Sequence, residues 1–222
     1  MSNIVSFRAK NFRSYKDEQE ISFLAIDDDF SSDNFHEVEL EDGKSIKLLN
    51  SAVIYGANAA GKSNIILAMK AFVYFVNGSA GFNYAERLPF EPFKLSSPND
   101  KKEAIKFTID FIYDKKFYRY SFSYKEIAPE AEKSIDVIFF EESFDICQKN
   151  EDSEFDEYVP CENIFIRNSD GIVECNANYF QLQSTRIQKK QLFMSRIGLD
   201  SEEDTWEFSI YQILTSIISI PN

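Results

Sequence analysis

The chain has 222 residues, of which 44% are hydrophobic and 15% aromatic, and its formal net charge is −13. This length and composition allow a packed core in one large or two small domains and exclude general disorder. An acidic chain repels nucleic acid and anionic membranes on average, which argues against a free-standing DNA-coating protein but leaves a local basic groove or a DNA-binding partner open.

The N-terminal part of the chain carries strand patterns. The segment "NIVSFRAKNF" alternates in hydrophobicity and predicts a strand, and "EQEISFLAI" (Glu18–Ile26) predicts a second strand after a turn. The segment "FHEVELEDGKSIKLL" joins two β-rich runs at Asp42-Gly43, which predicts a hairpin.

The next segment combines a strand, a loop and a helix. The short apolar run "SAVIY", residues 51–55, predicts a buried strand, and the loop Gly56–Gly61 follows it. From Lys62 onward apolar residues recur at helical spacing, and Asn77-Gly78 predicts the end of the helix. The recurring residues are Ile65, Ile66, Met69, Phe72, Val73 and Val76.

The rest of the chain predicts more strands and a last helix. Residues 79–100 contain three prolines and predict a loop. Residues 104–127 and 162–176 predict antiparallel hairpins, with a further strand over 134–146 between them. Residues 204–220 return to helical spacing and predict a C-terminal helix.

The motif with the clearest chemistry is "GANAAGKS", residues 56–63, which fits the pattern G-x-x-x-x-G-K-[ST]. Backbone N–H groups of such a loop cradle phosphate oxygens, and the helix that follows adds the positive end of its dipole. We expect Lys62 to reach the β- and γ-phosphates and the Ser63 hydroxyl to bind Mg²⁺. The sequence therefore predicts a site for ATP and Mg²⁺ between a buried strand and a helix N-terminus.

Hydrolysis also needs an acidic residue at the end of a buried strand. The weak local candidates for catalysis are Glu141 and Glu142 in "DVIFFEES". If they act, the chain is a self-contained AAA+-like NTPase. The neighbouring hairpin patterns instead favour an antiparallel strand that ends at a charged turn, since an AAA+ core would alternate strand and helix.

The segments "IVSFRAKNFRSYKD" and "LLNSAVIYGANAAGKSNIILAMKAF" together resemble the head domain of RecF/SMC-type ABC ATPases. They are also similar to the AAA-domain ATPases of bacterial phage defence, including abortive-infection and OLD-like proteins. The resemblance covers roughly residues 3 to 215. It implies a mixed α/β P-loop NTPase fold, the N-terminal lobe of an ABC-ATPase head with a strand-rich antiparallel subdomain. Residues 1–78 would form the nucleotide-binding core, and 79–222 the hairpins and last helix of the same lobe.

The resemblance also implies roles for single residues. Arg13 of "NFRSY" is expected near the phosphates, with a surface position at a strand end as the alternative. A Q-loop glutamine is expected among Gln181, Gln183 and Gln188. The implied nucleotide-binding residues are Gly56, Ala57, Asn58, Ala59, Ala60, Gly61, Lys62, Ser63, Asn64 and Arg13, with Ser63 also on Mg²⁺.

An ABC-type head also needs a signature motif and a Walker B strand, which in relatives lie well past residue 222. We therefore expect this chain to bind ATP and to hydrolyse it only with elements from a missing C-terminal half or a partner. The implied partners are a second ATPase head in a homodimer and an effector such as a nuclease or toxin, with DNA reached only through the assembly. A non-enzymatic interaction module is a further alternative.

The remaining features concern the compartment and charge. Three cysteines without a CxxC pair, no secretory signal and no apolar run of about 20 residues predict a cytoplasmic chain without a membrane segment. Four basic residues near the C-terminus could form one basic helix face or a solvated helix: Arg186, Lys189, Lys190 and Arg196.

Overall fold

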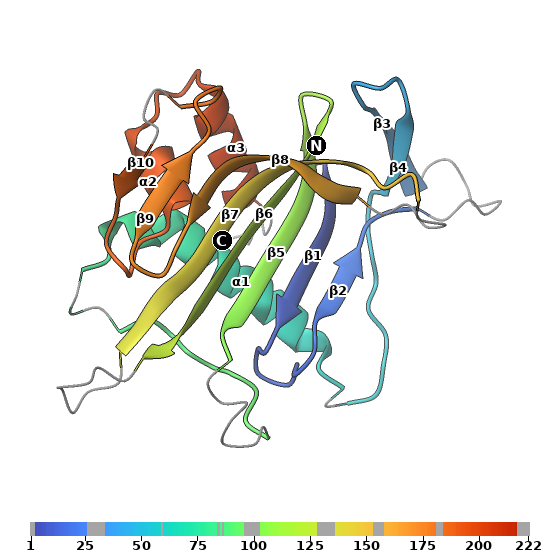
Figure 1. Ribbon diagram of the computed structural model, residues 1–222. Coiled ribbons are helices and arrows are strands. Elements are labelled where there is room, and N and C mark those ends of the chain that lie inside the picture. Colours follow the sequence, from blue (N-terminus) through green and yellow to red (C-terminus); the bar gives the residue numbers. More distant parts are fainter. Residues whose placement is uncertain are drawn as a thin grey trace.

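The computed structural model describes residues 3–25, 34–58, 60–83, 85, 87–95, 103–127, 136–152, 158–180 and 184–216. Its main feature is one eight-stranded sheet whose neighbouring strands are all antiparallel, with three α-helices against one face (Figure 1). This mixed α/β architecture with a large antiparallel sheet confirms the predicted fold class.

The strand order in the sheet is β10-β9-β8-β7-β6-β5-β1-β2. The strands are β1 (Ile4–Lys10), β2 (Gln19–Ser22), β5 (Ile105–Tyr113), β6 (Lys116–Ile127), β7 (Asp136–Lys149), β8 (Tyr158–Arg167), β9 (Ile172–Cys175) and β10 (Ser184–Arg186). Because β1 pairs with β5, the N-terminal segment lies inside the sheet formed mainly by the later hairpins. The predicted strand over Glu18–Ile26 is shorter than expected, since β2 ends at Ser22 and Ile26 lies outside the described residues.

The helices are α1 (Lys62–Gly78), α2 (Phe193–Asp200) and α3 (Trp206–Thr215), and a short 3₁₀ turn, η2 (Ser79–Gly81), follows α1. Helix α1 begins and ends where the sequence predicts. Its closing bond runs from the backbone N–H of Ser79 to the carbonyl of Phe75. The C-terminal helix is confirmed up to Thr215, and Ile217 and Ile218 lie outside the described residues.

Aromatic side chains join α1 to the sheet. The Phe72 ring packs edge-on against Phe7 of β1 at a centroid distance of 5.7 Å and stacks with Phe122 of β6 at 5.4 Å. One turn later, Phe75 meets Tyr124 at 4.9 Å and Phe139 at 5.3 Å. Each such pair contributes about 0.5–1.5 kcal/mol beyond the burial of its area. The helix that begins at Lys62 is therefore held in a fixed position across the sheet.

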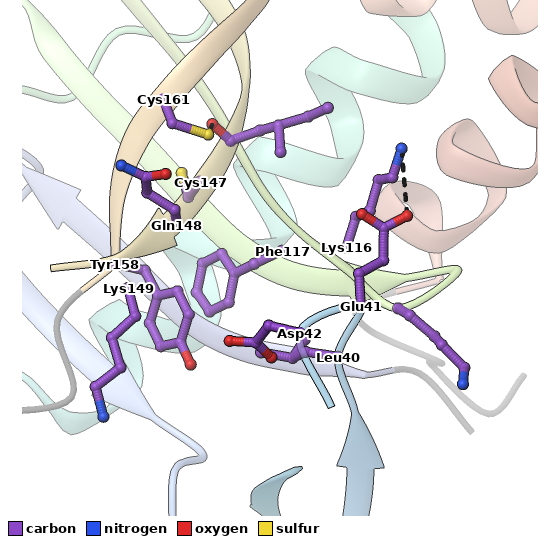
Figure 2. Close-up of a pocket in the computed structure, with 12 residues that line it drawn as sticks. Leu40, Glu41, Asp42, Lys116, Phe117, Cys147, Gln148, Lys149, Tyr158 and Cys161 are labelled. Atoms are coloured by element: carbon purple, nitrogen blue, oxygen red, sulfur yellow. Dashed lines mark hydrogen bonds and ion pairs between the residues drawn. The ribbon is translucent and has the colours of Figure 1, made fainter. Parts of the chain in front are cut away.

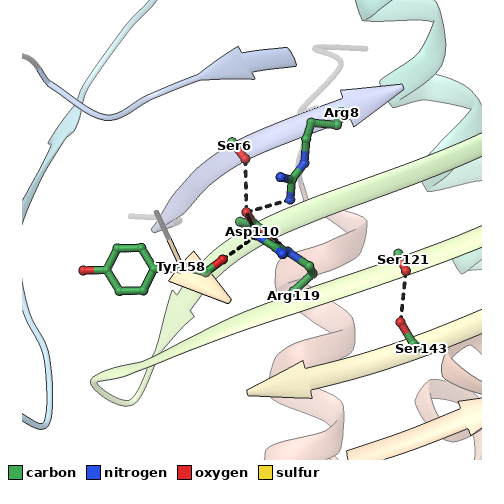
Figure 3. A network of polar contacts seen from close by, with 7 residues as sticks. All are labelled: Ser6, Arg8, Asp110, Arg119, Ser121, Ser143 and Tyr158. Carbon is green, nitrogen blue, oxygen red and sulfur yellow. Dashed lines mark hydrogen bonds and ion pairs between the residues drawn. The ribbon is translucent and has the colours of Figure 1, made fainter. Parts of the chain in front are cut away.

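The other face of the sheet carries a polar network centred on Asp110 of β5 (Figure 3). Arg119 of β6 binds its carboxylate with two hydrogen bonds, Nε to Oδ1 at 2.8 Å and Nη2 to Oδ2 at 2.9 Å. Arg8 of β1 donates to the same Oδ2 at 2.8 Å, and Ser6 lies at 3.4 Å. This network ties β1, β5 and β6 together by side chains as well as by the backbone ladder. Arg119 also donates to the Tyr158 carbonyl at 3.1 Å.

A second, smaller sheet is the hairpin of β3 (Phe35–Glu39) and β4 (Ser45–Leu49), which confirms the predicted turn at Asp42-Gly43. Its apolar side chains form a separate small cluster with residues of the large sheet. The buried members are Val5, Leu40, Ile46, Leu48, Ile112, Phe117, Cys147 and Tyr158. This hairpin therefore covers part of the sheet away from the helices.

Two sequence predictions are wrong. The run 51–55 forms no strand, and its side chains are exposed, Val53 by 71%, Ile54 by 41% and Tyr55 by 87%. No backbone hydrogen bond joins these three residues to any other described residue, and no described strand pairs with them. A strand is stabilised by pairing, so apolar content alone does not form one.

The second wrong prediction is a single basic helix near the C-terminus. Arg186 ends β10, Lys189 and Lys190 lie in a turn, and only Arg196 is helical. The Lys190 side chain is buried and pairs with Asp136 at 2.7 Å. Lys189, Lys190 and Arg196 pair with three different carboxylates, those of Asp170, Asp136 and Asp200. Among the described residues, no helix has the length and apolar content to cross a membrane.

Candidate nucleotide-binding site

The glycine-rich loop, residues 56–61, leads directly into α1. Gly61 caps the helix with φ 89° and ψ 1°, a left-handed conformation that glycine adopts without a steric cost. A β-carbon at this position would lie 2.9 Å from Ser14 Oγ and 3.1 Å from the Tyr15 ring. The second glycine of the motif is thus required both by its backbone angle and by a neighbouring turn.

Free donors gather at the start of α1. The backbone N–H groups of Lys62 and Ser63, the first two residues of the helix, have no acceptor among the described residues, whereas the Asn64 N–H donates to the Gly61 carbonyl at 2.8 Å. The Ser63 side chain is exposed, and its hydroxyl has no hydrogen-bond partner among the described residues. No acidic residue lies in this first turn, so the positive end of the helix dipole is not offset locally.

The Lys62 ammonium folds back over the loop. Its Nζ donates to the carbonyl of Gly56 at 2.8 Å and to that of Ala57 at 2.6 Å. Within the described part of the chain it forms no ion pair. The charge is therefore held close to the loop by neutral acceptors only, and an anion can compete for it without displacing a carboxylate.

A turn between β1 and β2 packs against the start of α1, and we name its residues, Asn11–Tyr15, the buttress turn. The Tyr15 hydroxyl donates to the Gly61 carbonyl at 2.7 Å, and the Asn64 amide donates to Ser14 Oγ at 2.6 Å. The resemblance left two positions open for Arg13, near the phosphates or on the surface at a strand end. In the structure its guanidinium pairs with Glu91 at 2.8 Å. The residues of the buttress turn that meet the glycine-rich loop and α1 are Ser14 and Tyr15.

A family model with the description "AAA domain, putative AbiEii toxin, Type IV TA system" matches residues 51–173, more than half of the chain. The match starts just before the glycine-rich loop and runs through β5 to β8. The chain belongs to this AAA-domain family. Its fold agrees with a P-loop NTPase, and the family is of the ATPase type. No curated protein matches the chain.

In this AAA-domain chain, the side chain of Glu142 is buried in the core. Its carboxylate, 1% exposed, accepts hydrogen bonds from the backbone N–H groups of Phe193 at 2.7 Å and Met194 at 2.9 Å, and from the Tyr120 hydroxyl at 2.8 Å. Burial raises the pKa of Glu142, while the nearby Arg167 charge and these donors act in the opposite direction. Glu142 thus caps the N-terminus of α2, while Glu141 of the same antiparallel strand is exposed.

The other residues that the sequence proposed for nucleotide binding in the AAA domain do not all lie at the glycine-rich loop. Asn58 and Ala60 lie exposed in the loop, while Ala59 lies outside the described residues. Of the three glutamines, only Gln188 is described, and its backbone carbonyl accepts from the buried Arg167 at 3.4 Å. Gln181 and Gln183 lie outside the described residues.

The sequence did not predict a role at this site for Tyr15 or Ser14. Their only signal was membership of the quoted "NFRSY" segment, and no spacing rule relates position 15 to position 61. Only the packing of β1 beside β5, with α1 across them, brings the buttress turn to the loop.

A cavity of about 210 Å³ lies elsewhere, between the β3–β4 turn and strands β6, β7 and β8 (Figure 2). Its charges are paired, as in the contact of Lys116 with Glu41 at 3.6 Å. Burial raises the pKa of its Cys147 thiol to about 12, so this thiol stays protonated and unreactive at neutral pH. Phe117 and Tyr158 stack in its wall with centroids 4.1 Å apart. The cavity shares no lining residue with the glycine-rich loop.

Proposed function

We propose that this chain is the ATP–Mg²⁺-binding lobe of an ABC-type ATPase of the phage-defence kind, and that it hydrolyses ATP only with elements from further polypeptide. The observation that carries the proposal is the junction of the glycine-rich loop with α1. There, two free backbone N–H groups, the Lys62 ammonium and the Ser63 hydroxyl gather at one helix end.

These groups suit a nucleotide with its metal. Backbone N–H groups and a lysine are the usual ligands of the phosphates, and a serine hydroxyl at this place suits Mg²⁺. Bound Mg²⁺ would neutralise charge on the phosphates, and this chain would contribute Ser63 to it. The N–H groups, Lys62 and the helix dipole would orient the phosphate chain.

Two further features support the need for additional polypeptide. The carboxylate of Glu142, the buried acidic candidate, already binds the N-terminus of α2 and the Tyr120 hydroxyl, and it has no hydrogen bond to the described residues of the glycine-rich loop. The exposed apolar run Val53–Tyr55 ends at the loop and has open backbone groups on both sides. A strand from elsewhere that pairs with this run would cover its side chains and bring an acidic residue to the phosphates.

The proposed assembly follows from the resemblance to ABC-type heads. Two heads would enclose ATP between them in a homodimer, and ATP binding or hydrolysis would control an effector such as a nuclease or toxin. DNA would be met through the assembly. The AbiEii toxin in the family description fits a role in defence.

The test is equilibrium binding of ATP with Mg²⁺ to the wild-type chain and to Lys62→Ala. Loss of a charge-assisted phosphate contact costs on the order of 2–3 kcal/mol, so affinity should fall about 30- to 150-fold. Lys70→Ala is the matched control, because Lys70 is exposed on the same helix and should leave binding unchanged. Equal affinity of wild type and Lys62→Ala would refute the site.

Hydrolysis is measured separately. We expect slow turnover by the chain alone and no change in it on Glu142→Gln or Glu141→Gln. Fast steady-state hydrolysis that disappears in Lys62→Ala would contradict the dependence on further polypeptide. If Glu142→Gln then retained nucleotide without turnover, the self-contained AAA+-like NTPase would replace the lobe that depends on further polypeptide as the proposed function.

A further inference from the structure

We propose that Tyr15 is a positioning residue for phosphate binding, whose hydroxyl fixes the peptide between Gly61 and Lys62 so that the Lys62 N–H faces the phosphates. The inference rests on the proposed nucleotide site and adds to it a residue from outside the glycine-rich motif. Three observations support it: one hydrogen bond, the planarity of the peptide, and the anchoring of the buttress turn.

The hydrogen bond acts on the peptide that matters most for the site. Tyr15 donates to the Gly61 carbonyl at 2.7 Å, and no cis peptide bond is present in the described chain. In a planar trans peptide, the carbonyl of one residue and the N–H of the next point in opposite directions. A donor that holds the Gly61 carbonyl on the side of the buttress turn therefore directs the Lys62 N–H to the other side.

This constraint matters because the peptide follows a glycine in the left-handed region. Glycine accepts both hands of φ, so the peptide that follows it can rotate at little cost. Gly61 has φ 89°, and Lys62 begins the helix directly after it. The Gly61 carbonyl also accepts the backbone N–H of Asn64 at 2.8 Å, and Tyr15 adds the side-chain contact that supports this orientation in the described structure.

The phenol is a dependable donor. Burial raises the pKa of Tyr15 above its ordinary value, and a backbone hydrogen bond with Ile65 acts in the opposite direction. The hydroxyl therefore keeps its proton throughout the neutral range. Its partner is a carbonyl rather than a carboxylate, so the contact does not titrate near neutral pH.

The buttress turn is itself fixed to the sheet and to a loop. Phe12 packs against Phe107 of β5 with centroids 5.4 Å apart, and the Tyr15 N–H donates to the Phe12 carbonyl at 2.8 Å. The Asn11 side chain donates to the Glu103 carbonyl at 2.9 Å and accepts from the Phe93 N–H at 3.1 Å. The Arg13 N–H donates to the Glu91 carbonyl at 2.8 Å. Because the buttress turn is anchored in this way, the Tyr15 hydroxyl holds the glycine-rich loop at a fixed position relative to the core.

The experiment compares Tyr15→Phe with Tyr211→Phe. Both changes remove one hydroxyl and keep the ring, and each hydroxyl bonds at one end of α1, Tyr15 to the N-cap residue Gly61 and Tyr211 to Asn77. Tyr211 bonds to the far end of the helix, where it donates to Asn77 Oδ1 at 2.8 Å. Tyr211→Phe therefore controls for the general loss of a hydrogen bond to α1.

Two probes are used, ATP with Mg²⁺ and inorganic tripolyphosphate with Mg²⁺. We expect Tyr15→Phe to weaken both by the same factor, about 3- to 10-fold, the range for loss of one neutral hydrogen bond. Tyr211→Phe should leave both affinities unchanged, and the change in its thermal midpoint measures the effect on stability of a hydrogen bond lost at an end of α1. Weaker binding in Tyr15→Phe alone would show that its hydroxyl positions the loop and that the effect is not a general loss of stability.

Other results overturn the inference. If wild type binds ATP through Lys62 and Tyr15→Phe binds both probes equally well, Tyr15 does not position the loop, and the proposed nucleotide site still holds. Weakened ATP binding with unchanged tripolyphosphate binding would place the effect away from the phosphates and would also refute it. If Lys62→Ala does not weaken binding, the proposed function and this inference fail together.

Discussion

Gly198 of α2 lies against the ring of Tyr211 of α3, so closely that a β-carbon on Gly198 would overlap with Tyr211 Cδ2 and Cγ. The same tyrosine reaches across to the end of α1 through its hydroxyl. One close contact therefore sets the spacing of the two C-terminal helices and links both to the helix that begins at the glycine-rich loop.

We predict that Gly198→Ala destabilises the chain by about 1–3 kcal/mol, the usual cost of overpacking, although alanine is the better helix former. The free energy of unfolding, measured by urea titration, tests this. Gly81→Ala is the control, because a β-carbon there meets nothing within 4 Å. A gain of stability in Gly198→Ala would show that α2 and α3 pack less closely.

A second prediction concerns the polar network on the sheet. Asp110→Asn removes the charge that two arginines share, and the side chain of Asp110 is only 6% exposed. Loss of one partner from a buried ion pair costs about 3–5 kcal/mol, and we expect a destabilisation of that order. Asp170→Asn, which breaks the exposed pair with Lys189, should cost less than about 1 kcal/mol. Equal effects in thermal unfolding would contradict the buried character of the network.

The third prediction is a pH dependence set by Glu142. Because burial raises its pKa above the unfolded value of 4.5, the folded chain holds this proton more tightly than the unfolded chain does. The contribution of Glu142 to stability is therefore present below the unfolded pKa and is lost as the pH rises through the folded pKa. We expect the stability of wild type relative to Glu142→Gln to fall from about pH 4.5 upward in urea titrations. A difference independent of pH would refute this.

A fourth prediction concerns Gly61. Gly61→Ala places a β-carbon in a left-handed backbone, which costs about 1–2 kcal/mol, and crowds Ser14 and Tyr15 as well. Gly43→Ala carries the same backbone penalty with open space around it. We expect a loss of stability in both variants, larger in Gly61→Ala, but a loss of ATP affinity only in Gly61→Ala, of at least about tenfold, which corresponds to 1.4 kcal/mol. Unchanged affinity would mean that the buttress turn and the loop are independent.

Local patterns were sufficient for most of the elements. The spacing of Phe72, Val76 and their neighbours predicted α1 to its last residue, because one apolar stripe on a helix has to face a core. Alternation predicted the hairpin of β5 and β6 with a turn over Asp114–Lys116, and in the structure the turn is Asp114 and Lys115, since Lys116 begins β6. The same reasoning failed at 51–55, where an apolar run pairs with no described strand, and in the basic segment, where helical order was assumed from charge alone.

The sequence by itself determined the glycine-rich loop, the helix that follows it, and the strand-rich character of the rest, since these depend on contacts between near neighbours in the chain. Tertiary structure alone decided that Glu142 caps α2 rather than standing free, and that Tyr15 meets Gly61 across 46 positions. The reason is physical. A hydrogen bond between distant residues depends on strand order and on the path of α1 across the sheet, and neither quantity is encoded in the spacing of any single segment.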